Sequence, residues 1–561
     1  MSWKIYVFFL VLIAAFLGLI VRCFYLQYQQ GDYYQNRSEL IQRRLIWQSP
    51  QRGPILDCKA RPLAASEKIN VVFAEPRVIK DPKEVANKLQ PILNMGAHDI
   101  CKIINDSKNP GYVKIAENVD TNSCLEASKI YGIGFESQWQ RHYPSDSLAC
   151  HLTGFVSIKG KGLEGIEMEY DKALAGTMGK DVFLADIRRR PIRYKEKGEE
   201  LSDGDRIILT IDATIQQFTR EALLEVFKKF QAESAMAIVA DPKTGAILAM
   251  VSLPDYNPNE YFTENQASFR NRAMTDQFEP GSIIKPVIVA IALDAGAISK
   301  GEKIFCENGM YVGKGFGRIK EYDFHRYGSM TPKEILIHSS NIGMAKIGQK
   351  LGKGKLHRGM TLFGFGNNTD IDLPGEVGGT LWPVSKWTGY SVTRIPFGQE
   401  ITVTGIQLVR AYCILSNGGY AVKPHVVKAI VDCRGNVKEM EKPLPSVGYV
   451  IKPEIAKWMV TDAMTAVVNE GTGKSAKLEK WQVYGKTGTA EIAMSGRKGY
   501  SGSDYIASFI AGAPAEDPKI VVLVSVRKPN RSLGLGYTGG AVSAPPAAKI
   551  IEKTLTYLES R

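Results

Sequence analysis

The chain has 561 residues, of which 44% are hydrophobic and 23% are charged. At roughly 150 residues per domain, this length predicts two to four folding units and excludes a single small binding module. The composition is that of an ordinary globular protein, which excludes disordered and fibrous classes. Lys and Arg number 71 against 58 acidic residues, and the resulting net charge of +13 suits anionic lipid, a cell-wall polymer or nucleic acid without choosing among them.

Cysteine and histidine carry no recognisable site. The eight cysteines are scattered without a C-x-x-C pair, so they predict neither a zinc site nor a disulfide-dense scaffold, and they leave the redox state open. The seven histidines show no H-E-x-x-H or similar spacing. We therefore expect no metal and no cofactor.

An apolar segment opens the chain. Residues 5–21 carry no charge, and if Arg22 snorkels, the apolar surface extends to Tyr25. These 21 residues would reach about 31 Å as a helix, enough to cross a bilayer core of about 30 Å. A cleaved signal peptide is the alternative, but the segment is longer than the usual apolar region and no A-x-A-like site follows it. We expect residues 1–25 to form a cytoplasmic tip and a retained anchor in membrane lipid. The flanking charges are nearly balanced and do not fix its orientation.

Two further domains are predicted after the anchor. Residues 26–205 mix polar stretches with short apolar runs and Gly/Pro turns, which indicates an irregular α+β module. A turn at Asp203-Gly204-Asp205 opens an alternating strand, and an amphipathic helix is predicted from Ala213 to about Phe230. We therefore place a new domain at residues 206–561.

This last domain shows the pattern of a sheet with helices. Residues 235–240 and 246–252 are apolar strand candidates, joined by a turn of sequence DPKTG that predicts a hairpin. Residues 505–511 and 520–526 predict two more strands, and residues 542–558 a closing helix. The expected fold class is α/β (α+β), with helices covering an at least partly antiparallel sheet.

A Ser-x-x-Lys pattern occurs three times. Ser495–Lys498 lies in a Gly/Ser-rich loop and Ser525–Lys528 ends an apolar strand, whereas Ser282–Lys285 opens an apolar helical run. Serine and lysine on the first turn of a helix share one face, close to the positive helix N-terminus. This arrangement suits a serine nucleophile with a lysine base. Because the ordinary lysine pKa of about 10.4 is too high for a base at neutral pH, burial or a second cation must lower it.

Lys-Thr-Gly occurs twice. Lys243-Thr244-Gly245 is explained by the hairpin turn, whereas Lys486-Thr487-Gly488 follows a strand-like stretch at 481–485 and continues as Thr489-Ala490. A strand edge with a lysine, hydroxyls and a glycine can hold a substrate carboxylate and let the substrate approach the backbone.

A third element is Ser339-Ser340-Asn341, inside a helix-like apolar stretch, while Ser107–Asn109 lies in a polar loop and is read as chance. Each motif alone is better explained as a cap, a helix surface or a turn, but all three in order make coincidence improbable. The segment 471–475 looks like a phosphate-binding loop, but Val468 stands where the motif needs glycine, which excludes nucleotide binding.

With these motifs the sequence resembles the class B penicillin-binding proteins, membrane-anchored D,D-transpeptidases of peptidoglycan synthesis with S-x-x-K, S-x-N and K-T-G motifs. The resemblance covers nearly the whole chain. It includes RGPILD at residues 52–57, residues 143–155, GLEGIE at residues 162–167, and residues 241–259. The FEPGS run at residues 278–282 and the short tail after residue 545 resemble septal, cell-division members.

Two stretches depart from the family pattern. Cys58-Lys59-Ala60-Arg61 stands where the family usually has Arg-Asn-Gly after Asp57, and Glu400 stands where glycine is usual. The first puts contacts of the N-terminal pedestal in doubt, and neither touches the three motifs.

The resemblance implies a serine acyl-enzyme mechanism. Ser282 would attack the carbonyl between the two terminal D-alanines of a stem peptide, and Lys285 would take its proton. Ser339 would relay a proton to the departing amine, Asn341 would hold the substrate amide and Lys285, and Lys486 would keep the cluster's electrostatics poised.

The substrate would be held on the Lys-Thr-Gly strand. Thr487 and Thr489 would bind the terminal carboxylate beside Gly488, and the backbone N–H groups of Ser282 and Thr489 would form the oxyanion hole.

The resemblance also implies partners and a location. These are peptidoglycan stem peptides, β-lactams as inhibitors, a polytopic glycosyltransferase and other division proteins, with no nucleic acid. The bulk of the chain would be periplasmic, anchored by one pass in the cytoplasmic membrane. A β-lactamase or β-lactam sensor of the same fold, and a non-catalytic division scaffold, remain the alternatives.

Overall fold

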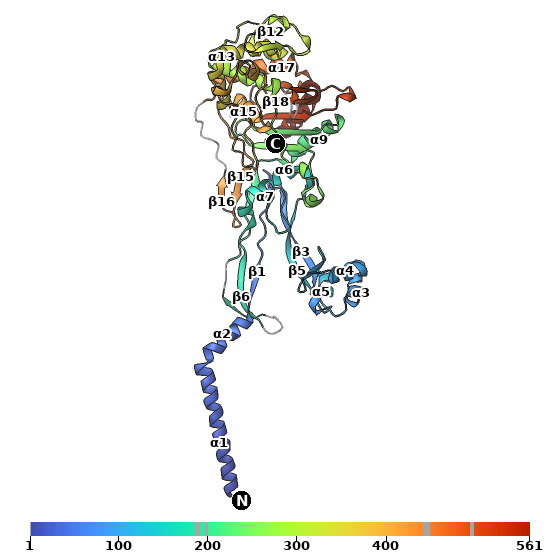
Figure 1. Cartoon of the computed structure of the whole chain (residues 1–561), viewed down its shortest axis with the longest axis vertical. Coiled ribbons are helices and arrows are strands. Elements are labelled where there is room, and N and C mark those ends of the chain that lie inside the picture. Colours follow the sequence, from blue (N-terminus) through green and yellow to red (C-terminus); the bar gives the residue numbers. More distant parts are fainter. Residues whose placement is uncertain (1, 186–190, 197–199, 441–448, 494–498, 561) are drawn as a thin grey trace. The chain divides into compact units, whose positions relative to one another are not determined.

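The computed structural model describes residues 2–185, 191–196, 200–440, 449–493 and 499–560 (Figure 1). The chain divides into two compact units. The first comprises residues 1–52, 68–139 and 175–204, and the second comprises residues 53–67, 140–174 and 205–561. Each unit is thus assembled from separate stretches of sequence. The domain boundaries expected at residues 25 and 205 stay a prediction.

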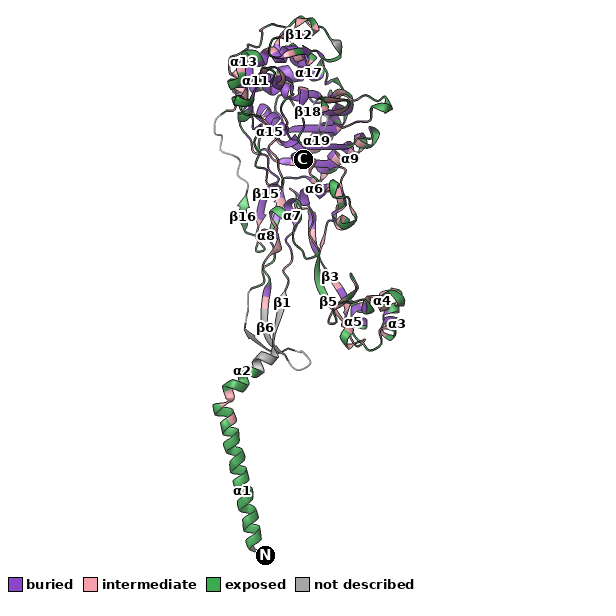
Figure 2. Cartoon of the chain, in the orientation of Figure 1, coloured by how far each residue is buried: buried purple, intermediate pink, exposed green. Residues whose placement is uncertain are grey.

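The first unit begins with helix α1 (Ser2–Phe24), a π-helical turn at Tyr25–Gln29 and helix α2 (Gly31–Gln42). Figure 2 shows α1 exposed along its length. Among the described residues, the stretch Trp3–Gln29 is the one helix long and apolar enough to cross a membrane. The 23 residues of α1 alone reach about 35 Å. An N-terminal helix of this kind, ahead of a large folded part, fits a single-pass membrane protein.

The rest of the first unit is a mixed α+β structure. Its three-stranded antiparallel sheet has the order β1-β6-β7, formed by Arg43–Gln48, Gly179–Ala185 and Pro191–Glu196. A separate small core, with Leu89 and Ile100 at its centre, lies among short helices and strands. These elements are α3 (Pro82–Leu93), α4 (Ala97–Asn105), α5 (Thr121–Ala127), β4 (Val113–Ala116) and parts of β3 (Pro62–Ala74) and β5 (Ile133–His142).

The second unit is built on a five-stranded antiparallel sheet. Its order is β10-β9-β19-β18-β17, which places β17 at an edge. The strands are β9 (Ser234–Ala240), β10 (Ile247–Leu253), β17 (Tyr484–Ala493), β18 (Tyr500–Ala513) and β19 (Ile520–Arg527). The predicted hairpin of β9 and β10 is confirmed, and the predicted edge strand begins at Tyr484, so that Lys486-Thr487-Gly488 lies within it.

Both faces of this sheet are covered by helices. Because side chains alternate along a strand, Ala237 and Val239 of β9 pack in one core with helices α9 (Ala213–Lys229) and α19 (Ala544–Glu559). Met236 and Ile238 point to the other face and pack in the core that contains α15 (Gly405–Ser416). Burial on both faces explains why these strands read as continuous apolar runs.

A second sheet in this unit has the order β16-β15-β8-β2 and continues to the first residues of β3. Its strands include β16 (Val437–Met440), β15 (Val427–Val431), β8 (Arg206–Leu209) and β2 (Ile55–Leu56). The closing helix differs from expectation by starting at Ala544, because two prolines occupy its first turn, where a missing N–H is tolerated.

Three helices carry the remaining motif residues: α11 (Lys285–Asp294), α12 (Pro332–His338) and α13 (Asn341–Leu362). The apolar stretch predicted as helix-like around Ser339 is not one helix. Ser339 has φ +57, which ends α12, and the Ser340 side chain caps α13 by accepting a bond from Gly343 N. The helix breaks because a left-handed residue cannot continue it and because a serine N-cap satisfies the next helix's free donors.

Candidate active site

Ser282 and Lys285 lie where a tight turn enters helix α11. The turn is a 3-10 helix at Gly281–Ile284, and Gly281 has φ +54. A β-carbon on Gly398 would lie 2.2 Å from the Gly281 carbonyl oxygen, so two glycines let these backbones touch. Ser282 is partly exposed and lines a cavity of about 880 Å³. The turn therefore presents the hydroxyl to a space large enough for a peptide-sized ligand.

Lys285 is fully buried beneath this turn. Its Nζ donates to the Ser339 carbonyl oxygen at 2.6 Å and to Asn341 Oδ1 at 2.9 Å, with Ser339 Oγ at 3.3 Å. Desolvation lowers the pKa of Lys285 to about 7, although the nearby Glu321 carboxylate opposes that shift. Lys285 can therefore act as a proton acceptor near neutral pH, as the sequence chemistry required.

Lys486 reaches the same hydroxyl from strand β17. Its Nζ donates to Ser339 Oγ at 3.0 Å and to the Thr487 carbonyl oxygen at 3.1 Å. Burial, and then the charge of Lys285, hold the pKa of Lys486 well below its ordinary value. Lys486 is thus the second basic group that the sequence predicts beside Lys285, and Ser339 Oγ lies between the two amines.

Glu321 fixes the turn that carries Ser339 and Asn341. This buried carboxylate accepts from Asn341 N at 2.7 Å, from Ile342 N at 3.3 Å and from the hydroxyl of Ser340. The first N–H groups of a helix lack partners within it, and a negative charge there is favourable. Glu321 thus holds the N-terminus of α13 in place and, with it, the Asn341 side chain that contacts Lys285.

The Lys-Thr-Gly strand forms the opposite wall of the cavity. Thr487 and Thr489 both line it. Thr487 Oγ1 shares a 2.6 Å hydrogen bond with Thr472 Oγ1, and Thr489 Oγ1 accepts from Gly539 N at 3.1 Å. A β-carbon on Gly488 would lie 2.8 Å from the Ile283 side chain, so glycine allows β17 to approach the turn that bears Ser282.

The structure brings all eight sequence-predicted site residues to one cavity or its wall. Ser282, Ser339, Asn341, Thr487 and Thr489 line it, and the buried Lys285 and Lys486 bond to residues that do. Gly488 lies between the two threonines on β17.

The other copies of the motifs lie elsewhere. Lys243 is in the β9–β10 turn and pairs with Asp517 at 2.6 Å, and Ser525 is buried in β19 against Ser508 at 2.9 Å. Ser107 donates to the backbone of Asn109 in a loop. The Ser495–Lys498 copy lies outside the residues that the structure describes.

Sequence reasoning missed two contributors. Glu321 precedes Asn341 of the Ser-x-Asn motif by twenty residues and carries no local signal, so only the fold reveals it. Thr472 belongs to the glycine-rich segment 471–475 that resembles a phosphate loop. The structure puts this segment against the Lys-Thr-Gly strand, with Gly471 and Thr472 on the cavity wall. The available signal was a glycine-rich run after an apolar helix, because glycine lets the backbone lie close to a neighbouring strand.

Comparisons with known proteins match this arrangement. Residues 235–552 match the penicillin binding protein transpeptidase domain, and residues 48–209 match the penicillin-binding protein dimerisation domain. Stage V sporulation protein D of Bacillus subtilis is 30% identical over 97% of this chain and 84% of that protein. The probable peptidoglycan D,D-transpeptidase PenA of Neisseria meningitidis is 30% identical over 97% of this chain and 90% of that protein.

A solved structure supports the same assignment. The crystal structure of a peptidoglycan synthetase from Bifidobacterium adolescentis superposes with a TM-score of 0.74 at 26% identity, covering 92% of this chain and 97% of that one. The match extends over both parts of the chain and includes the sheet that carries Lys486. The chain belongs to the class B penicillin-binding proteins, with a C-terminal transpeptidase domain.

Proposed function

We propose that this protein is a serine-type peptidoglycan D,D-transpeptidase that cross-links stem peptides during septal wall synthesis. The observation that carries the proposal is the pair of buried lysines that both donate to Ser339 Oγ beside Ser282. The relatives named as peptidoglycan D,D-transpeptidases support the substrate class.

In the first half-reaction, Ser282 Oγ attacks the carbonyl between the two terminal D-alanines. Lys285 accepts the hydroxyl proton, which its low pKa permits near neutral pH. The C–N bond of the tetrahedral intermediate then breaks, and a proton relayed through Ser339 goes to the nitrogen of the departing D-alanine. The product is an acyl ester on Ser282.

The remaining residues position the substrate and stabilise the oxyanion. Thr487 and Thr489 bind the terminal carboxylate, and Gly488 leaves room for the peptide backbone beside the strand. The backbone N–H groups of Ser282 and Thr489 stabilise the oxyanion, and loss of one such donor typically costs about 2.7–4 kcal/mol. Asn341 orients the substrate amide and Lys285, and Lys486 keeps the cluster electrostatically poised.

In the second half-reaction, an amine from a neighbouring stem attacks the ester, transfers a proton to the cluster and releases Ser282, which leaves a cross-link. The glycan strand is polymerised by a partner, a polytopic glycosyltransferase, and other division proteins place the complex. The α1 helix anchors the protein in the cytoplasmic membrane with its N-terminus inside, because the substrate lies on the outer side. The net charge of +13 then suits anionic lipid or wall polymer.

A fluorescent penicillin tests the proposal. We expect durable labelling of the wild-type chain and none of Ser282→Ala, with the fold of the variant checked by thermal unfolding. Rapid loss of the label with turnover of the drug would favour a β-lactamase, a labelled chain without cross-linking activity would favour a sensor, and absence of labelling would favour a scaffold. A depletion strain that fails to divide supports the septal role, whereas one that loses its shape but divides contradicts it.

A further inference from the structure

A second large cavity lies within the second unit and shares no lining residue with the one that holds the motifs. Its volume is about 680 Å³, within the range of cavities that enclose small ligands or a few side chains. Aromatic rings form most of one wall: Phe155, Tyr256, Tyr261 and Phe269 pack on one another with ring centroids 4.4 to 5.8 Å apart. Phe262, at the edge, is 75% exposed.

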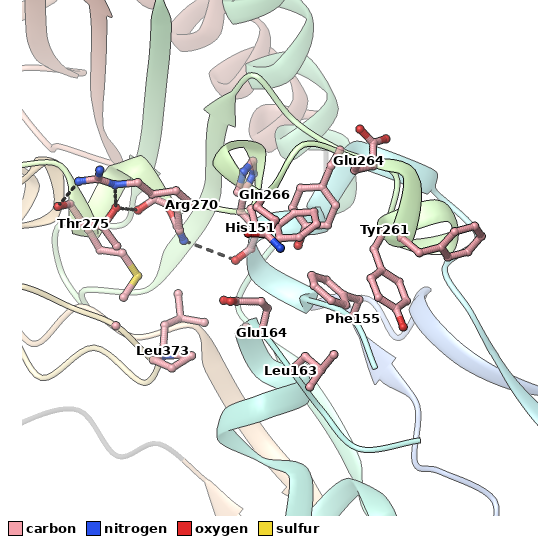
Figure 3. Close-up of a pocket in the computed structure, with 18 residues that line it drawn as sticks. His151, Phe155, Leu163, Glu164, Tyr261, Glu264, Gln266, Arg270, Thr275 and Leu373 are labelled. Atoms are coloured by element: carbon pink, nitrogen blue, oxygen red, sulfur yellow. Dashed lines mark hydrogen bonds between the residues drawn. The ribbon is translucent and has the colours of Figure 1, made fainter. Parts of the chain in front are cut away.

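Several polar groups of this cavity are engaged by the protein itself. Arg270 donates to Thr275 (Figure 3). Asn271 donates to the His151 carbonyl oxygen, and Glu264 accepts from the Asn257 backbone N–H. His151 is buried and donates from its ring to the Ser268 carbonyl oxygen, and burial lowers its pKa to about 4, so that it is neutral. These groups have little capacity left for a ligand rich in hydroxyls, such as a sugar chain.

Glu164 is the exception among the charged side chains of the cavity. It lines the cavity beside Leu163, Phe155 and Leu373, as Figure 3 shows, and within the described part of the chain its carboxylate has no hydrogen-bond or ion-pair partner. The surrounding walls partly desolvate it, and this burial alone raises the pKa of its carboxyl. Glu164 nevertheless remains exposed, so its carboxylate is open to an incoming cation, and pairing with one would offset the cost of the partial desolvation.

The backbone at Glu164 is rigidly placed. Gly154 and Gly165 have φ +71 and +57, and a β-carbon on Gly154 would lie 1.8 Å from the Glu164 carbonyl oxygen. The same oxygen accepts a hydrogen bond from Met168 N at 3.1 Å. Close backbone packing of this kind, possible only with glycine, holds the backbone that carries Glu164 in one position. The backbone of this wall is therefore in place before any ligand arrives.

We propose that this cavity binds a lysine or arginine side chain presented by an apolar segment of a partner protein. The charge would pair with Glu164, the aliphatic stem would lie along the aromatic wall, and a neighbouring apolar side chain would cover Phe262. A cation that lies over one of the aromatic rings is also attracted by the negative charge on the face of the ring. A protein segment fits better than a sugar chain because the unpaired Glu164 carboxylate lies beside much apolar surface.

The test uses three capped peptides, Ac-Ala-Leu-X-Leu-Ala-NH2, with lysine, norleucine or glutamate at X. Binding to the full chain in lipid nanodiscs is measured by calorimetry, with empty nanodiscs as the blank. We expect the lysine peptide to bind about tenfold more tightly than the norleucine peptide, as a charge-assisted hydrogen bond predicts. The glutamate peptide should bind more weakly than either.

Variants separate the charge from the apolar wall. Glu164→Gln should remove the preference for lysine over norleucine, and Phe262→Ala should weaken both peptides. Glu169→Gln, which changes an exposed carboxylate outside the cavity, is the matched control and should change nothing. Penicillin labelling at wild-type level in each variant shows that it is folded.

Several outcomes would overturn the proposal. They are equal affinity for the lysine and norleucine peptides, an unchanged preference in Glu164→Gln, or no binding of any peptide. Binding of a chitin tetrasaccharide that is lost in Phe262→Ala, without binding of the lysine peptide, would show a sugar site instead.

Discussion

Glu321→Gln removes a negative charge from beneath the Ser-x-Asn turn and nearly preserves the side-chain volume. In the structure the carboxylate accepts bonds from two backbone N–H groups of α13 and from Ser340. Glutamine keeps one oxygen as an acceptor, but its NH2 group then faces a group that also donates. At least one of these bonds is therefore lost. Because hydrogen bonds to charged groups are worth about 1.5–3 kcal/mol, we expect the free energy of unfolding to fall by about 2–3 kcal/mol. At about 2–4 °C per kcal/mol, Tm should fall by about 4–12 °C.

The same substitution should move the pH dependence of acylation. Glu321 raises the pKa of Lys285, so its neutralisation lowers that pKa further below about 7. A lysine base works in its unprotonated form, and the acid limb of the acylation profile should therefore move to lower pH. The assay is the rate of labelling by a fluorescent penicillin between about pH 5 and 9, together with thermal unfolding.

Asp323→Asn is the matched control. Asp323 is an exposed carboxylate on the same cavity, and asparagine tolerates its left-handed backbone. It should change neither Tm nor the acid limb. An acid limb that moves to higher pH in Glu321→Gln, or an unchanged Tm, would refute the role assigned to this carboxylate.

Four further predictions concern other parts of the chain. Lys486→Met should lower penicillin acylation at least about 100-fold without lowering Tm, because it removes the amine that bonds Ser339 Oγ and poises the cluster, and this amine is also costly to bury; unchanged acylation would contradict the role of Lys486. Lys243→Ala should acylate like the wild type, since it breaks only a surface ion pair; loss of labelling in a folded variant would mean that the wrong Lys-Thr-Gly was chosen. A chain without residues 1–25 should be soluble and acylate normally but fail in the cell; normal division without the anchor, or a folded protein that binds no penicillin, counts against this. Ala60→Gly should raise the free energy of unfolding by about 0.5 kcal/mol in denaturant titrations, because relief at φ +61 exceeds the entropy that glycine adds to the unfolded chain; a loss of stability would contradict it.

Motif context was enough to predict, from the sequence, residues that the structure brings to one cavity. Ser282 could be separated from Ser525 because it opens an apolar run after a Pro-Gly turn, whereas Ser525 ends a strand. Lys243 could be set aside because its neighbours form a hairpin turn. In each case the neighbouring residues determine a local backbone, and the local backbone determines what the side chain can reach.

Contacts between distant segments could not be predicted in the same way. Glu321 acts from a separate loop, and nothing in its own neighbourhood distinguishes it from other carboxylates of the chain. The break at Ser339 was missed because the apolar pattern continues through it, although serine caps are a known interruption. The cavity around Glu164 joins residues 151–165 to residues 256–275 and 373–375, a juxtaposition that only the fold creates.

The arrangement of charges around the two lysines determines whether an amine is available to accept a proton at neutral pH. Among the described residues, neither Lys285 nor Lys486 forms an ion pair, and their hydrogen-bond acceptors are neutral oxygens of Ser339, Asn341 and Thr487. A carboxylate bonded directly to Lys285 would raise its pKa and keep the amine protonated. Glu321 instead forms its hydrogen bonds with the N-terminus of α13, so its charge only partly offsets the lowering of the Lys285 pKa by desolvation. Because the Glu321 carboxylate bonds to α13 and not to Lys285, Lys285 is left able to accept a proton. The N–H groups at the start of α13 keep the carboxylate in that position.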